Sequence, residues 1–190
     1  MNKEFIEDKQ FKGANYAQKY LTVANYENCT FTDCVFASCD LSDVSFAECR
    51  FENCDFSLAK LKNTAFKSCL FKTCKLLGLH FEDCNKFLLA MSFENCLLNL
   101  SSFYQVNLSK TPFHECNLQE VDFAGAVLTK AIFQNCDLTG AIFDQTNLEQ
   151  ADFRSSFGFT IDPENNRMKK ARFATSELAG LLVKYDLRIE

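Results

Sequence analysis

The sequence predicts an all-β solenoid, in which the chain coils around a core with four sides. Three observations predict this fold. A large apolar residue, here called a centre, recurs every five residues from Ile6 to Phe81 and again from Leu88 to Phe153. A small or thin residue, often Cys, stands two positions before most centres. Cys96, Cys116 and Cys136 recur every twenty residues, which indicates four five-residue sides per coil.

A period of five suits neither a helix nor a straight strand. At 100° per residue the centres would drift around a helix, and at 180° they would alternate between the faces of a strand. The chain must therefore turn at every repeat and keep two side chains of each repeat inside. The two runs of centres predict about seven coils, with a register slip of two residues at 85–87.

When the coils are superposed at four repeats per turn, residues of the same type lie above one another. One internal column is predicted to be aromatic and another to consist of thiols. The aromatic column contains Phe11, Phe31, Phe51, Phe71, Phe93, Phe113, Phe133 and Phe153. The thiol column contains Cys34, Cys54, Cys74, Cys96, Cys116 and Cys136.

Composition narrows the class of protein. The chain has 190 residues, 47% hydrophobic and 24% charged, which is enough to bury a core. We expect a repeat domain over residues 1–155 and a C-terminal cap with a possible dimerisation segment over 156–190. The net charge of −5 argues against a basic nucleic-acid-binding surface, so no direct nucleic-acid contact is expected. Charges interrupt residues 1–9 and no apolar run is long enough to span a bilayer, so we expect a cytoplasmic protein without membrane contact.

The eleven cysteines are expected to be reduced core residues. No Cys-x-x-Cys pair occurs, and Cys residues five apart fall on different sides of the coil, which argues against a metal site. The two histidines, His80 and His114, sit beside centres on different sides and cannot assemble a catalytic group. We therefore expect no enzyme activity, no metal and no cofactor.

The C-terminal segment predicts a cap on the last coil. Residues 157–163 are interpreted as a turn leading away from the rod. From residue 176 the apolar spacing predicts a short amphipathic helix, and the alternation after it predicts a strand. This segment is also the candidate dimer interface, formed by Leu178, Leu181, Leu182, Tyr185, Leu187 and Ile189.

One side of the predicted rod is acidic. This acidic side has the centres Leu41, Leu61, Phe81, Phe103, Phe123 and Phe143, and it carries six carboxylates against Lys60 and Lys62, a net charge of −4. The side with centres Tyr26, Phe46, Phe66, Leu88, Leu108, Leu128 and Leu148 comes to zero. The candidate partner-binding residues on the acidic side are Asp40, Asp43, Glu82, Asp83, Asp122 and Asp144.

Three five-residue segments, 136–140, 141–145 and 151–155, resemble the repeats of the pentapeptide-repeat family. That resemblance covers about residues 6–155 and implies a right-handed quadrilateral β-helix. Residues 161–167 and the apolar tail further resemble the microcin-immunity and quinolone-resistance members of the family. The chain departs from the quinolone-resistance members because it lacks long inserts between coils.

The resemblance implies a function. Those members bind DNA gyrase or topoisomerase IV as mimics of duplex DNA, protect it from a toxin or quinolone, and dimerise through their C-termini. The sequence leaves a second interpretation open, an interaction scaffold or immunity factor with a different protein partner. In either case we expect a homodimer that acts by binding another protein.

Overall fold

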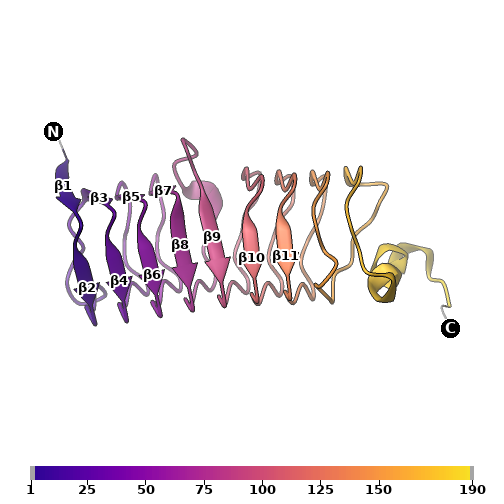
Figure 1. Cartoon of the computed structure of the whole chain (residues 1–190), viewed down its shortest axis with the longest axis horizontal. Helices are drawn as coiled ribbons and strands as arrows, with labels where there is room; N and C mark the ends of the chain where they lie inside the picture. Colours follow the sequence, from indigo (N-terminus) through magenta and orange to yellow (C-terminus); the bar gives the residue numbers. More distant parts are fainter. Residues whose placement is uncertain (1–2, 189–190) are drawn as a thin grey trace.

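The computed structural model describes residues 3–188, which form a rod of stacked coils (Figure 1). Two parallel sheets run along it, with the orders β1-β3-β5-β7 and β11-β10-β9-β8-β6-β4-β2. The first sheet comprises β1 (Glu4–Glu7), β3 (Ala24–Glu27), β5 (Ser45–Ala47) and β7 (Ala65–Lys67). The second comprises β2 (Gln10–Lys12), β4 (Thr30–Thr32), β6 (Arg50–Glu52), β8 (Cys69–Lys72), β9 (Met91–Glu94), β10 (Pro112–His114) and β11 (Ile132–Gln134).

The strand register confirms four sides per coil. Phe31 pairs with Phe51 and Phe113 pairs with Phe133, each at an offset of one twenty-residue coil. Phe71 pairs with Phe93, which shows the two-residue insertion between these coils. The fold is a parallel β-solenoid of about seven turns, as the sequence predicts.

The two sheets and two further columns of bridges define four sides. The β1 side continues beyond β7 through bridges such as Asn107↔Val127, and the β2 side contains the seven-stranded sheet. The Phe36 side is held by bridges such as Asp55↔Lys75. The acidic side is held by bridges such as Ser102↔Asp122 and contains the 3₁₀ turn η1 (Phe81–Asp83).

Most corners of the coil use a left-handed backbone conformation. Asp33, Ser38 and Asp43, spaced five residues apart, have φ values of 56°, 57° and 64°. Asn and Asp tolerate this region better than most residues because their short side chains hydrogen-bond locally. The left-handed residue turns the chain once per repeat and so produces the five-residue period.

The core is the stack of centres that the sequence predicts. The rings of Phe113 and Phe133 are 5.0 Å apart with an interplanar angle of 2°. Phe103, on the neighbouring side, meets Phe113 edge-on at 6.2 Å and 81°. Both geometries are favourable for aromatic pairs, so each ring is fixed by its own column and by the next one.

The structure corrects the predicted centre at the insertion. Leu88 was expected to point inward, but its side chain is 64% exposed and its φ is 56°. Leu89 packs against the core instead. Cys84, which precedes the insertion, stays buried in the earlier register. The two extra residues therefore enter after Cys84 and are absorbed as a bulge on the β1 side.

Coil pairing continues past residue 155, where the five-residue pattern of the sequence stops. Phe157 bridges Asp137 and Arg172 bridges Asp152, so residues 157–163 do not lead away from the rod as expected. The hydrogen bonds between coils use backbone N–H and C=O groups, and every residue except proline has both. An irregular sequence can therefore still complete the last coil.

The cap is helical but of a tighter type than expected. It comprises two 3₁₀ segments, η2 (Thr175–Leu181) and η3 (Val183–Tyr185). The cap packs closely on the last coil, where the Ile161 amide donates to the Gly180 carbonyl oxygen at 3.0 Å. The expected strand is not present at Leu187, which is exposed and lies outside any strand. Ile189 lies outside the described residues.

Candidate partner-binding surfaces

The six candidate carboxylates lie on one side of the rod. Backbone bridges link Asp40 to Lys60 and Asp122 to Ile142 along this side. Glu82 and Asp83 belong to η1, between those two points. The acidic side is therefore interrupted by the coil that carries Lys60 and Lys62.

Two of these carboxylates also close their own turns. Asp40 Oδ1 accepts the Ser42 amide at 3.0 Å, and Asp122 Oδ1 accepts the Ala124 amide at 2.8 Å. The hydrogen bond from Ser42 holds the pKa of Asp40 below its usual range. A carboxylate used in this way has a fixed position, so it presents an oriented negative charge to solvent.

Two other carboxylates connect successive coils. Asp43 Oδ1 accepts the Asn63 side-chain amide at 2.7 Å, and Asp144 accepts the side-chain amide of Asn165. Glu82 Oε1 lies 3.0 Å from His80 Nδ1, while Glu82 Oε2 is buried without a hydrogen-bond partner within the described residues. The acidic side is thus partly a structural network, which its sequence pattern does not reveal.

The structure adds two acids that the sequence pattern missed. Gln145 donates its amide to the Asn165 carbonyl at 3.1 Å, which places Asp162 and Glu164 next along the acidic side. Lys184 Nζ lies 2.7 Å from Asp162 Oδ1 and 2.7 Å from Glu164 Oε2. Its hydrogen bonds lower the pKa of both carboxyls. Lys184 of the cap therefore offsets one of these two negative charges.

The candidate dimer residues divide into two groups. Leu181 packs against the core and Leu182 is half-buried, so these two hold the cap on the rod. Leu178, Tyr185 and Leu187 remain exposed. Only the exposed group is available to another molecule.

The eleven thiols are all buried and unpaired. Their S–H groups lie near backbone carbonyls, as at Cys136, whose Sγ is 3.4 Å from the Phe113 oxygen. Burial raises the pKa of the Cys49 thiol to about 12. Among residues 3–188, no group of three or more His, Cys, Asp or Glu side chains could hold a metal ion.

A basic corner was missed by the sequence pattern. Lys110, Lys130 and Lys170 occupy the same left-handed position between the β1 and β2 sides. The repeat pattern of the β1 side ends at the centre Leu148 and does not include Arg167, Lys169 and Lys170, which the last coil adds to this side.

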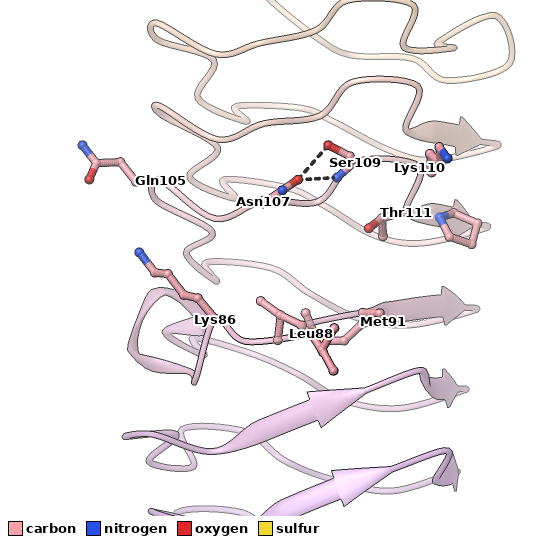
Figure 2. A pocket seen from close by; sticks show the side chains of 11 residues that line it. Lys86, Leu88, Met91, Gln105, Asn107, Ser109, Lys110 and Thr111 are labelled. Atoms are coloured by element: carbon pink, nitrogen blue, oxygen red, sulfur yellow. Dashed lines mark hydrogen bonds between the residues drawn. The ribbon is translucent and has the colours of Figure 1, made fainter.

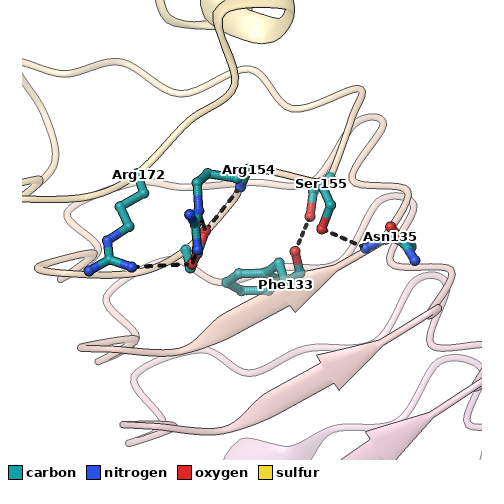
Figure 3. A network of polar contacts seen from close by, with 7 residues as sticks. Phe133, Asn135, Arg154, Ser155 and Arg172 are labelled. Atoms are coloured by element: carbon teal, nitrogen blue, oxygen red, sulfur yellow. Dashed lines mark hydrogen bonds and ion pairs between the residues drawn. The ribbon is translucent and has the colours of Figure 1, made fainter.

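A polar network joins the last coils on the β2 side (Figure 3). Asp152 Oδ2 is 2.7 Å from Arg154 and 3.8 Å from Arg172. The hydrogen bond from Arg154 holds the pKa of Asp152 below its usual range. Ser155 Oγ accepts the Asn135 amide at 3.2 Å, so the network fixes the penultimate coil to the irregular final coil.

A groove of about 410 Å³ lies on the β1 side beside the insertion (Figure 2). One wall is the bulged segment 86–91, and the other is formed by the next coil, residues 105–112. Figure 2 shows Lys86 and Leu88 on one wall and Asn107 and Ser109 on the other. Only the position of the register slip in the sequence pointed to this place.

These features define a class of protein: a repeat solenoid whose outward side chains form continuous surfaces along a rod. Within residues 3–188 no helix has the length and apolar character needed to cross a bilayer.

Family models identify the repeat. A model described as pentapeptide repeat region matches residues 44–123, and one described as pentapeptide repeats matches residues 20–53 and 116–154. Together they span residues 20–154, and the chain belongs to the pentapeptide-repeat family. A search of curated protein sequences finds no match.

Solved structures share the fold. A trypsin-treated variant of QnrB1, a plasmid-mediated fluoroquinolone resistance protein, is 21% identical with a TM-score of 0.50, covering 98% of this chain and 100% of that one. HetL, a pentapeptide-repeat protein involved in heterocyst differentiation regulation in the cyanobacterium Nostoc sp. strain PCC 7120, is 16% identical with a TM-score of 0.64, covering 92% and 88%. At these identities the likeness establishes the shared solenoid.

Proposed function

We propose that this protein is a non-catalytic binding protein that contacts DNA gyrase or topoisomerase IV as a partial DNA mimic and protects it from a toxin or a quinolone. The observation that carries the proposal is the row of carboxylates from Asp40 to Asp144 along one side of a rod. QnrB1, a fluoroquinolone resistance protein with the same fold, supports the choice of partner.

The acidic side carries fewer charges than DNA of the same length, so it would mimic DNA only in part. Asp40 and Asp144 lie five coils apart, which is about 24 Å at ~4.8 Å per coil. A DNA duplex carries about 14 charges over that length, against six carboxylates here. Complementary charge of this density steers a basic partner surface and orients it, while most of the affinity must come from other contacts.

Binding rather than catalysis fits the chemistry of the surface. The carboxylates of Asp40, Asp122 and Asp43 accept hydrogen bonds that close turns or join coils, and the thiols are buried. The proposal includes a cytoplasmic location and a homodimer formed through the exposed residues of the cap, Leu178, Tyr185 and Leu187.

The decisive experiment is a gyrase supercoiling assay with a quinolone, titrated with the protein. The variant Asp122→Asn/Asp144→Asn removes two charges but keeps the carbonyl oxygens that accept from Ala124 and Asn165. We expect it to bind gyrase several-fold more weakly than the unchanged protein, and we expect that binding to weaken as salt is raised.

The matched control is Glu48→Gln/Glu149→Gln on the β1 side, which removes the same charge and should matter much less. Equal binding by both double variants, or no binding of gyrase by the unchanged protein, would show the acidic-side mimic to be wrong.

A second candidate function is an interaction scaffold or immunity factor with a different protein partner. It is favoured by exposed leucines on the Phe36 side, where Leu58 and Leu100 occupy equivalent corners two coils apart and Leu97 lies nearby. Mimicry of the charge of DNA does not by itself require them. If they serve another partner, Leu100→Asp leaves every gyrase readout unchanged.

A further inference from the structure

The backbone ladder is interrupted at one level of the β1 side. Between the coils of Leu108 and Leu128 it is complete: the Leu108 amide donates to Val127 at 2.8 Å and the Lys110 amide to Thr129 at 2.9 Å. Between the bulged segment 86–90 and the coil of Leu108, no backbone hydrogen bond forms within residues 3–188. The four-stranded sheet also ends at β7, just before this level.

The insertion explains the interruption on the β1 side, and a proline extends it to the start of β10. The bulged segment pairs with the preceding coil, where the Asn85 amide donates to Thr64 at 2.9 Å and the Ala90 amide to Phe66 at 3.0 Å. Pro112 has no N–H to donate, whereas its equivalent in the next coil, Ile132, donates to Thr111. The edge formed by residues 107–112 therefore stays open inside an otherwise continuous ladder.

The backbone groups of the open edge are exposed, and the turn that carries them is fixed by hydrogen bonds. Asn107 Oδ1 accepts from the Ser109 amide at 3.0 Å and from the Ser109 hydroxyl at 2.7 Å, which fixes the turn (Figure 2). Asn107 and Ser109 are exposed, whereas their equivalents Val127 and Thr129 in the next coil are half-buried. The Asn107 amide and the carbonyls of Asn107 and Ser109 have no protein partner among residues 3–188.

The groove beside this edge has a definite chemistry. Its lining contains Lys86 and Lys110 and no carboxylate, in a protein whose net charge is −5. Neither lysine amine makes a hydrogen bond or ion pair within the described part of the chain. The apolar part of the wall is formed by Leu88, Leu89 and Met91.

We propose that this groove binds an extended acidic peptide segment of a partner protein by strand addition. The peptide backbone pairs with Asn107 and Ser109, as occurs at open sheet edges that accept a strand. Because side chains of a strand alternate, acidic residues on one face reach Lys86 and Lys110 while apolar residues on the other contact Leu88. This site lies on a different side from the acidic row and does not depend on gyrase binding.

The test uses a hexapeptide of alternating Glu and Val, blocked at both ends, titrated into the isotopically labelled full chain and followed by amide NMR. We expect saturable shifts at Asn107, Ser109 and Lys110. Lys110→Glu should weaken binding at least tenfold. Lys130→Glu is the matched control, because Lys130 has the same backbone conformation one coil further on, where the ladder is complete, and it should change binding less than twofold.

Two further peptides separate strand addition from simple charge attraction. A peptide of alternating Lys and Val should not bind. The Glu and Val peptide N-methylated at alternate residues keeps its charge but cannot pair its backbone, and it should lose at least tenfold in affinity. The proposal is overturned if Asn107 and Ser109 do not shift at millimolar peptide, if the two lysine variants weaken binding equally, or if the methylated peptide binds as well as the parent.

Discussion

The Ile161 amide donates to the carbonyl oxygen of Gly180 at 3.0 Å, and this bond joins the last coil to the C-terminal cap. It requires close approach, because a Cβ at position 180 would lie 2.2 Å from the Phe159 carbonyl oxygen. The cap is thereby seated on the open backbone edge that any stacked solenoid leaves at its end.

Gly180→Ala should detach the cap while leaving the coils folded. Hydrogen exchange at the amides of residues 161 and 175–185 should accelerate at least tenfold, because the new methyl group cannot fit against the Phe159 carbonyl. Ser176→Ala, an exposed change in the same helix, is the control and should leave exchange unchanged. Unaltered exchange in the glycine variant would contradict the docking described here.

Phe113→Ala should destabilise the protein by about 3–5 kcal/mol, because it empties a fully buried position in a stacked aromatic column. Phe87→Ala removes an equally large side chain that is 70% exposed, and it should cost less than about 1 kcal/mol. Urea denaturation measures both. Similar losses for the two variants would contradict the inward assignment of Phe113.

The thiols should be inert until the protein unfolds. All eleven are buried, so an excess of a thiol reagent at neutral pH should label few of them in the native protein and all of them in denaturant. Mass spectrometry counts the labels. Rapid native labelling of six or more would disagree with this core.

Stability should decrease in alkaline solution. Burial raises the pKa of Cys49 to about 12, and it also raises the pKa of Cys69 and Cys84 above the ordinary value for a thiol. As pH rises past about 9 the unfolded chain loses these protons first, so the free energy of unfolding falls with pH up to about 12. Below about pH 8 the thiols are protonated in both states and contribute no pH dependence. Denaturation midpoints from pH 7 to 11 measure this, and Cys49→Ala should show a smaller alkaline loss.

Self-association, if it uses the cap, should depend on its exposed residues. Leu178→Glu/Leu187→Glu places two charges on exposed positions of the cap and should convert a dimer to a monomer without affecting thermal stability. Light scattering gives the mass. A dimer that persists in this variant would place the interface elsewhere on the rod.

Much of the fold could be predicted because the same pattern of inward and outward residues recurs in every coil. Phe93, Phe113 and Phe133 occupy equivalent positions in successive coils, so the same contact is specified at every level. A pattern repeated in this way reveals its period, and the period determines the number of sides. The acidic row followed directly from that count.

By itself the sequence determined the coil, its four sides, its aromatic and thiol columns and the row of outward carboxylates. These depend on the alternation of inward and outward side chains, which is local and periodic. The tertiary structure decided that Leu89 rather than Leu88 packs inward, that Asp40 and Asp122 close turns, and that the ladder opens at Asn107. The physical reason is that these features depend on which backbone groups meet between coils. Backbone groups are nearly the same in every residue, so their pairing leaves little trace in the order of the side chains.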